Sequence, residues 1–207
     1  IGARTTESQV HRQLASALPC PIGFKNGTDG NIRVAIDAIQ ASEASHLFTA
    51  PGSQGGMVVI KSEGNPAGHI ILRGGTRPNY HQSDVEEAAE RLARQGLTPR
   101  LMVDCSHGNS QKLHKNQIRV AGELCRQLGE GSDAIAAVMV ESFLQGGSQK
   151  PAPLAELVYG QSVTDACLCW DDTQILLAML AEAVETRRQH PGRAQPDIAR
   201  WHAQLAS

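Results

Sequence analysis

Leu101–Asn109, with the sequence Leu-Met-Val-Asp-Cys-Ser-His-Gly-Asn, is the stretch that decides the fold of this chain. It begins as an apolar run of strand length and changes abruptly to polar residues. Such a run is typical of a buried parallel strand that delivers side chains to the carboxyl edge of a sheet. Enzymes of the α/β class keep their chemistry at that edge. We therefore expect functional residues directly after this strand.

Four other stretches also run from apolar residues to a charged one. They are Ile1–Arg4, Pro21–Lys25, His69–Arg73 and Ala136–Glu141. A single basic residue at a strand end is often a solvated charge or a salt-bridge partner. Arg4, Lys25 and Arg73, however, end three separate strands, and the carboxyl ends of parallel strands meet in one pocket. The pattern therefore predicts a cationic site for a phosphorylated anion.

A second group of residues has the types of a metal site. His107, Glu141 and Asp165 lie on three consecutive loops that follow predicted strands. One imidazole with two carboxylates suits Mn²⁺, Fe²⁺, Co²⁺ or Zn²⁺ better than a purely oxygen-seeking ion. Cys167 and Cys169 lie close by, but their spacing is not that of a zinc ribbon and no second pair exists. We interpret both as core thiols.

Composition excludes several classes of function. The formal net charge of -2 argues against bulk binding to nucleic acid or to a membrane surface. Five cysteines at irregular spacings, without a secretory signal or a long apolar span, favour a reducing cytoplasm. The chain has no Walker A sequence and no Gly-x-Gly-x-x-Gly that opens a helix, so nucleotide hydrolysis and dinucleotide redox chemistry are not expected.

The order of elements indicates the α/β class. Strands alternate with helical patterns in about five units, which predicts a parallel sheet but is too few to close an eight-stranded barrel. A Pro-Gly-Ser-Gln-Gly-Gly segment between two short strands predicts a β-hairpin insertion at His46–Lys61. We expect one domain over residues 1–188 and a polar, loosely held tail over 189–207, from which Trp201 and Leu205 are the residues that could dock.

Several local features are also expected. Ile1–Arg4 is predicted as a strand end, followed by a capping box at Thr6–Gln9 and a helix with Val10, Leu14 and Leu18 on its apolar face. A later helix is predicted to be capped by Ser83–Glu86 and closed by Gly96. Residues 146–159 form a loop too long for a simple connector, which predicts a lid or an interface arm.

Six motifs of this chain resemble those of the class I DAHP synthases, the 3-deoxy-D-arabino-heptulosonate 7-phosphate synthases that open the shikimate pathway to aromatic amino acids. The resemblance runs from Ile1 to about Arg188. Its motifs are Gly2–Ser8, Gly23–Gly30, Leu72–Gly75, Asp104–Asn109, Met139–Ser142 and Ser162–Ala166.

This resemblance implies a (β/α)8 TIM barrel, present here as roughly strands 4 to 8, that condenses phosphoenolpyruvate with erythrose 4-phosphate. It implies that phosphoenolpyruvate is held by Ala3, Arg4, Lys25 and Arg73. It also implies a divalent metal, with Mn²⁺ as the first choice, on His107, Glu141 and Asp165. Within these sets, Lys25, Arg73 and His107 are the predicted catalytic residues.

Two features of the family are missing from these 207 residues: a Cys metal ligand on an early strand, and a Lys-Pro-Arg-Thr-Thr phrase for the aldose phosphate. Cys105, Cys167 or a water would have to replace the ligand, although Cys105 is expected to point into the packed layer. One hypothesis is therefore the carboxyl-terminal part of a synthase, with low activity alone. The other is a partial barrel that binds phosphoenolpyruvate, metal or a partner chain without turnover.

The resemblance further implies feedback control by an aromatic amino acid and assembly as a homo-oligomer. The hairpin insertion is the expected effector surface because it lies outside the alternation of strands and helices. Its Phe48-Thr-Ala-Pro51 phrase is nearest to the tryptophan-sensitive members.

Overall fold

The computed structural model describes residues 1–189 of the chain. Its strands are β1 (Ile22–Lys25), β2 (Leu47–Pro51), β3 (Met57–Lys61), β4 (Gly68–Leu72), β5 (Leu101–Asp104), β6 (Ile135–Met139), β7 (Gln145–Ser148) and β8 (Gln161–Ser162). Its helices are α1 (Gln9–Ser16), α2 (Arg33–Glu43), α3 (Gln82–Arg94), α4 (Asn116–Gly129) and α5 (Trp170–Gln189), with one 3-10 turn at Leu154–Glu156.

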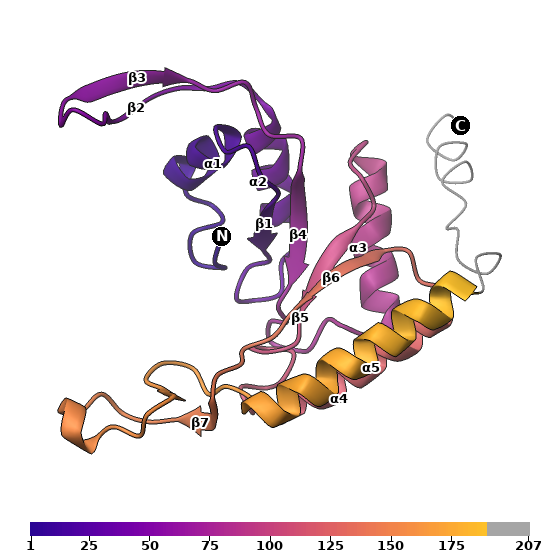
Figure 1. Ribbon diagram of the computed structural model, residues 1–207. Coiled ribbons are helices and arrows are strands. Elements are labelled where there is room, and N and C mark those ends of the chain that lie inside the picture. Colours follow the sequence, from indigo (N-terminus) through magenta and orange to yellow (C-terminus); the bar gives the residue numbers. More distant parts are fainter. Residues whose placement is uncertain (190–207) are drawn as a thin grey trace.

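The main sheet contains β1, β4, β5 and β6 in that order, and all neighbouring strands are parallel (Figure 1). Lys25 pairs with Ile71, Leu72 with Val103, and Asp104 with Met139. This register brings the four carboxyl ends to one edge. The predicted parallel sheet is confirmed.

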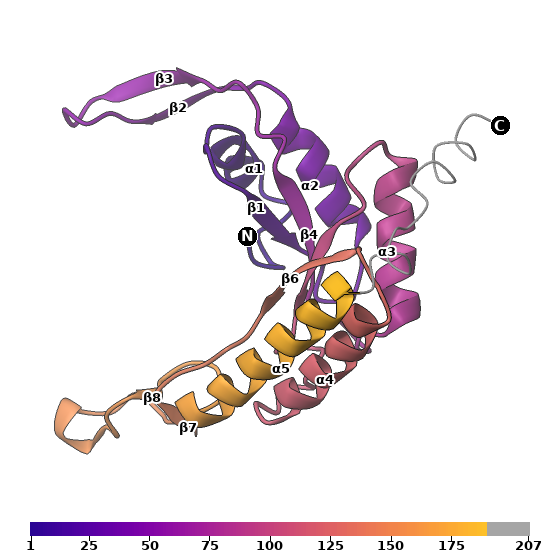
Figure 2. The same cartoon turned by 45° about the vertical axis from the view of Figure 1, so that its right-hand side comes forward.

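Helices α2, α3 and α4 follow one another along the same side of the sheet (Figure 2). Their buried residues are mostly small or aliphatic, which allows close packing on the strands. They include Ala35 and Ile39 of α2, Val85 and Leu92 of α3, and Val120 and Leu124 of α4. On the strands, Phe24, Ile70 and Leu101 are completely buried. Helix α5 packs along α4.

The predicted hairpin is confirmed. β2 and β3 pair in antiparallel fashion from Leu47 opposite Lys61 to Pro51 opposite Met57. The hairpin projects from the body (Figures 1 and 2), and Val59 is 71% exposed. A β-sheet of two strands with such exposure gains little from its own packing.

The amino-terminal predictions are wrong. Ile1–Arg4 is part of a turn, because the carbonyl of Gly2 accepts hydrogen bonds from the backbone N–H groups of both Thr5 and Thr6. These bonds fold the backbone back on itself and prevent an extended strand.

Helix α1 also differs from expectation. It starts at Gln9 after Ser8, whose side chain makes no cap hydrogen bond, so the predicted box at Thr6–Gln9 is absent. The apolar residues Val10, Leu14 and Leu18 are exposed. Within α1, the residues that pack inward are Ala15 and Ser16, because small side chains allow close approach to the body.

The cap predicted at Ser83–Glu86 is also misplaced. Helix α3 already begins at Gln82, and the carboxylate of Asp84 accepts a hydrogen bond from the backbone N–H of His81. The predicted end of this helix is confirmed, since it stops at Arg94 and Gly96 adopts a left-handed φ of 74°.

The long segment at residues 146–159 forms an arm rather than a plain loop. It contains part of β7 and the 3-10 turn at Leu154–Glu156, and the arm extends away from the sheet (Figure 1). The predicted tail, with Trp201 and Leu205, lies outside the described residues apart from Gln189. Among the described residues, no helix is both long and apolar enough to span a membrane.

Gly74 tests how tightly the loops after β4 and β5 are packed. It has a φ of 75°, and a Cβ atom there would lie 2.5 Å from the backbone N of Asn109. Gly96 has a φ of 74° with nothing within 4 Å of a Cβ atom. Both Gly74→Ala and Gly96→Ala should lose about 1 kcal/mol from the left-handed backbone. Gly74→Ala should lose at least about 2 kcal/mol more through the clash.

Urea denaturation of the two variants measures this difference in the free energy of unfolding. Equal losses in both variants would show that the loops after β4 and β5 are not in close contact.

Candidate functional site

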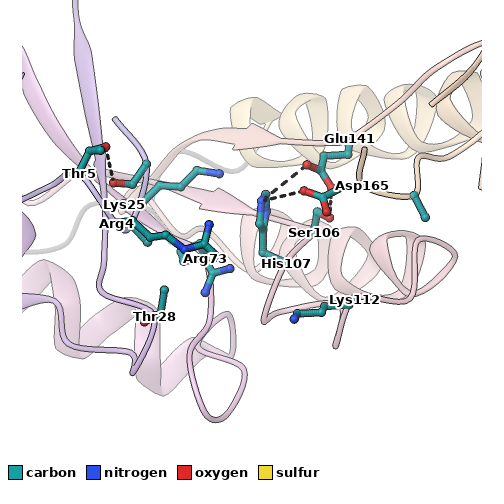
Figure 3. Close-up of a pocket in the computed structure, with 13 residues that line it drawn as sticks. Arg4, Thr5, Lys25, Thr28, Arg73, Ser106, His107, Lys112, Glu141 and Asp165 are labelled. Carbon is teal, nitrogen blue, oxygen red and sulfur yellow. Dashed lines mark hydrogen bonds and ion pairs between the residues drawn. The ribbon is translucent and has the colours of Figure 1, made fainter. Parts of the chain in front are cut away.

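A cavity of about 540 Å³ opens at the carboxyl edge of the main sheet (Figure 3). Arg4, Lys25 and Arg73 lie on one side of it and His107, Glu141 and Asp165 on the other, with Lys112 below His107. The cavity is lined by Gly2, Ala3, Arg4, Thr5, Lys25, Thr28, Arg73, Ser106, His107, Lys112, Glu141, Asp165 and Ala166.

The cationic side combines residues from two strand ends and the amino-terminal turn. Lys25 is the last residue of β1, and Arg73 directly follows β4. Arg4 reaches the same cavity because the turn is fixed to β1. The Thr6 hydroxyl donates to the carbonyl of Lys25 at 2.8 Å, and the backbone N–H of Lys25 donates to the carbonyl of Ile1 at 3.0 Å.

A buried asparagine holds the loop that carries Arg73. The Asn26 side-chain oxygen accepts a hydrogen bond from the backbone N–H of Arg73 at 2.8 Å. Its amide group donates to the carbonyl of Gly74 at 2.9 Å. These bonds fix the Arg73 backbone relative to β1. The Arg73 side chain therefore starts from a backbone that is held close to the end of the strand that carries Lys25. Neither Arg4 nor Arg73 forms an ion pair with another described residue.

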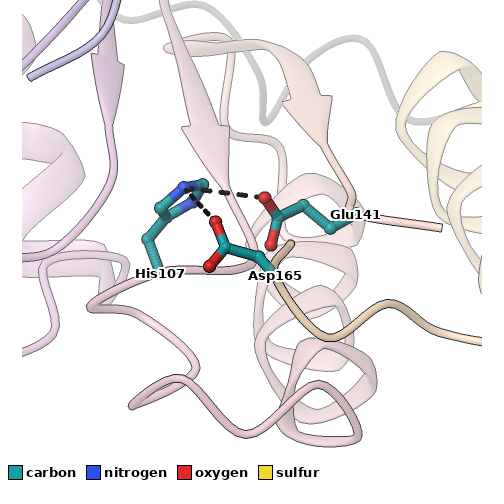
Figure 4. Close-up of side chains that lie close together, drawn as sticks. All are labelled: His107, Glu141 and Asp165. Atoms are coloured by element: carbon teal, nitrogen blue, oxygen red, sulfur yellow. Dashed lines mark ion pairs between the residues drawn. The ribbon is translucent and has the colours of Figure 1, made fainter. Parts of the chain in front are cut away.

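The metal-ligand types meet on the opposite side (Figure 4). The Nε2 atom of His107 lies 3.6 Å from Oε1 of Glu141 and 4.0 Å from Oδ2 of Asp165. One ligand atom from each of the three residues lies within 4.8 Å of the others. Metal–ligand bonds of about 2.0 to 2.2 Å place neighbouring ligand atoms at separations of this order. The three side chains therefore fit a divalent cation.

Neighbouring side chains fix Glu141 at both its backbone and its carboxylate. The Gln117 side chain, which is buried on α4, accepts from the Glu141 N–H at 2.9 Å and donates to the Glu141 carbonyl at 3.0 Å. The Ser106 hydroxyl donates to Oε2 of Glu141 at 2.6 Å. Because Oε2 is occupied in this way, Oε1 is the oxygen that faces His107.

A buried carboxylate lies between the two sides. Asp104 is 0% exposed, and its Oδ2 atom forms an ion pair with Nζ of Lys25 at 2.7 Å. The same oxygen lies 2.9 Å from Nδ1 of His107. Burial alone raises the pKa of the Asp104 carboxyl. The His107 ring and the Lys25 ammonium outweigh that effect, so the pKa of Asp104 is lowered and its charge is retained.

Comparison with known proteins places the chain in one family. Residues 1–178 match the DAHP synthetase I family. The chain belongs to this family. The Trp-sensitive phospho-2-dehydro-3-deoxyheptonate aldolase of Salmonella typhimurium is 56% identical over 187 residues, which cover 90% of this chain and 54% of the relative. The enzyme of the same name from Escherichia coli K12 is 55% identical over the same length.

A solved structure of a similar protein has the same fold over the part that it shares with this chain. Phospho-2-dehydro-3-deoxyheptonate aldolase from Francisella tularensis superposes with a TM-score of 0.86 at 45% identity, over 90% of this chain and 55% of that protein. The chain thus spans about half the length of the family members it matches.

The structure brings all seven predicted site residues into the one cavity: Ala3, Arg4, Lys25, Arg73, His107, Glu141 and Asp165. Residues that the sequence reasoning did not assign are Asn26, Asp104, Ser106, Lys112 and Gln117. Asp104 and Ser106 lie in the same polar stretch as His107, and this position could have predicted that they belong to the site. Asn26 and Gln117 gain their roles from partners distant in sequence, for which the sequence offers no signal.

Cys105 is not available to replace the missing metal ligand. Its side chain is 0% exposed and belongs to the hydrophobic core, as predicted. Burial, together with the charge of Asp104, raises the pKa of the Cys105 thiol to about 12. The interpretation of Cys167 and Cys169 as core thiols is wrong, because both are only half-buried and lie outside the hydrophobic core. The Cys167 thiol lies 3.5 Å from the carbonyl of Asp165.

The thiols should therefore differ in reactivity. We expect iodoacetamide to label the exposed Cys20 in the native protein at neutral pH and to leave Cys105 unmodified, because only thiolates react and Cys105 is both buried and protonated. Peptide mass spectrometry measures the labelling, and both cysteines should react after denaturation. Native labelling of Cys105 at the rate of Cys20 would contradict its place in the core.

Proposed function

We propose that this chain supplies the phosphoenolpyruvate and metal sites of a 3-deoxy-D-arabino-heptulosonate 7-phosphate synthase. The observation that carries the proposal is that a basic group and a His-Glu-Asp group face each other across one cavity in a member of this family. The reaction joins phosphoenolpyruvate to erythrose 4-phosphate and releases inorganic phosphate. A phosphorylated carboxylate and an aldehyde would be held on the two sides of the cavity.

The basic residues would bind and orient phosphoenolpyruvate. The planar guanidinium of Arg73 can bind a phosphate or carboxylate with two parallel hydrogen bonds, and Lys25 adds a compact charge that can move a proton. Arg4 and the backbone of Ala3 close the same side of the cavity. Holding the enol ester in this way directs its C3 atom toward the metal side and converts a bimolecular encounter into a positioned one.

His107, Glu141 and Asp165 would hold the divalent cation, with Mn²⁺ first and Fe²⁺, Co²⁺ or Zn²⁺ as alternatives. When bound, the cation supplies Lewis-acid chemistry toward the aldehyde oxygen of erythrose 4-phosphate. C3 of phosphoenolpyruvate then bonds to the aldehyde carbon, and water adds at C2. The phosphate leaves by cleavage of its C2–O bond, and the basic residues remain in place to bind it.

The wider organisation is proposed from the same family membership. The parallel sheet with outer helices would be strands 4 to 8 of a (β/α)8 TIM barrel, with residues 1–188 as its catalytic part and 189–207 as a polar tail. The name of the Salmonella typhimurium relative supports tryptophan as the effector, with the hairpin at His46–Lys61 as the surface for it. The exposed apolar residues of this hairpin support a homo-oligomer, and the biosynthetic role supports the cytoplasm.

The alternative function is binding without turnover. The Asp165 side chain is 73% exposed, and these 207 residues contain no Lys-Pro-Arg-Thr-Thr phrase for the second substrate. β1 and β6 are the two edges of the described main sheet, and unpaired edges favour self-association or a partner chain. These features favour weak binding and little catalysis by the chain alone.

Turnover distinguishes the two functions. We expect the 207-residue chain alone to release little phosphate from phosphoenolpyruvate. A chimera that adds the amino-terminal part of the Salmonella typhimurium relative should release phosphate only with erythrose 4-phosphate and Mn²⁺, and a chelator should abolish the release. An inactive but folded chimera would refute the synthase proposal. Robust turnover by the chain alone would refute the binding-only alternative.

Arg73 can be tested without turnover. Arg73→Ala should weaken binding of phosphoenolpyruvate by about 10- to 100-fold, because a charge-assisted hydrogen-bond pair contributes about 1.5 to 3 kcal/mol. Isothermal titration calorimetry measures the affinity. Arg100→Ala is the matched control, since Arg100 is exposed and directly precedes β5 at the opposite edge of the sheet. Equal effects of the two substitutions would show that Arg73 acts only through overall charge.

A further inference from the structure

Asp104 is a buried charge that the proposed chemistry does not use. It is the last residue of β5, it is 0% exposed, and it is absent from the lining of the cavity. An ionised carboxylate in such a place is costly unless charged or hydrogen-bonded partners compensate it. The residues that compensate the Asp104 carboxylate therefore indicate its role in the site.

The partners of Asp104 belong to both sides of the site. Oδ2 lies 2.7 Å from Nζ of Lys25 and 2.9 Å from Nδ1 of His107, and Oδ1 accepts a hydrogen bond from the Ser106 N–H at 2.9 Å. His107 Nδ1 is buried and forms no hydrogen bond with another described residue, so the contact with Oδ2 is an electrostatic one. A single oxygen thus touches one anion-binding side chain and one metal-ligand side chain.

The sheet explains why this contact is specific. β4 lies between β1 and β5, so Lys25 and Asp104 belong to strands that are not hydrogen-bonded to each other. The Lys25 side chain must reach across the end of β4 to meet the carboxylate, and only 14% of it remains exposed. The Asp104 carboxylate therefore lies between the Lys25 ammonium and the His107 ring, in contact with both.

We propose that Asp104 is a positioning residue that joins the metal site to the anion site, an inference that rests on the proposed function. The negative charge of its carboxylate beside Nδ1 favours the tautomer of the neutral His107 ring that carries its proton on Nδ1, which leaves Nε2 unprotonated and directed at Glu141 and Asp165. It also places negative charge between the Lys25 ammonium and a bound cation, and so reduces the repulsion between them.

This role predicts effects of opposite kind on the two ligands. Without the carboxylate, His107 loses the negative charge beside Nδ1 and a bound cation faces Lys25 directly, so metal affinity should fall. A phosphate near Lys25 should bind no more weakly, because a negative charge beside its binding group has been removed. A general loss of structure would instead weaken both ligands.

The test uses Asp104→Asn in the 207-residue chain, with Glu63→Gln as a control that removes an exposed carboxylate far from the cavity. Mn²⁺ binding is followed by the free-ion electron paramagnetic resonance signal, and binding of inorganic phosphate by calorimetry. For Asp104→Asn we expect the Mn²⁺ dissociation constant to rise about 10- to 100-fold, as for other partners of metal-binding histidines, while that of phosphate stays the same or falls. Glu63→Gln should change neither.

Parallel weakening of both ligands in Asp104→Asn, or no change in Mn²⁺ affinity, would overturn this inference while leaving the proposed function intact. Failure of the unsubstituted chain to bind either ligand would overturn both. If Asp104→Asn does not fold, a measurement on the unsubstituted protein tests the same inference. Long-range ¹H–¹⁵N NMR spectra of metal-free protein at alkaline pH should show His107 protonated on Nδ1, and protonation on Nε2 would refute the positioning role.

Discussion

The four strands of the main sheet are parallel and in a register that brings their carboxyl ends to one edge, and the whole site depends on this constraint. Lys25 ends β1, Arg73 follows β4, His107 follows β5 and Glu141 follows β6. A slip of one residue in any strand would exchange the side chains that face the core for those that face the opposite side. The buried Ile70, Leu101 and Val103 oppose such a slip, so core packing sets the positions of the charged residues at the edge.

Charge balance is the second level of organisation. Arg4, Lys25 and Arg73 lie close together, an arrangement whose mutual repulsion is relieved by the carboxylate of Asp104 and, in the proposed complex, by a phosphorylated ligand. On the other side of Asp104, the carboxylates of Glu141 and Asp165 would be balanced by a divalent cation. Each of these two groups therefore carries an excess of charge of one sign, which favours a ligand of the other sign.

The sequence allowed prediction of the parallel strands, of the hairpin and of the convergence of the candidate site residues on one cavity, because a change from apolar to charged residues marks the end of a buried strand. It failed where two conformations satisfy the same local pattern. Ile1–Arg4 has the composition of a strand end, yet hydrogen bonds to Gly2 make a turn. Val10 and its helical neighbours have core spacing, yet they are exposed. The support of Arg73 by Asn26 joins residues 47 positions apart, and only the tertiary fold brings them together.

The three candidate metal ligands are held with different strength, because they come from different elements of the fold. His107 and Glu141 lie at the edge of the main sheet, and buried Asp104 and Gln117 contact them. Asp165 comes from the segment after β8, outside the main sheet. That segment returns beside Glu141 through backbone hydrogen bonds of Leu168 to Glu141 and Phe143, both at 2.9 Å. These bonds fix the backbone near Asp165 but leave its carboxylate in solvent. Cation binding would therefore order Asp165 more than its two partners, since a ligand group that is free beforehand loses more conformational entropy on binding.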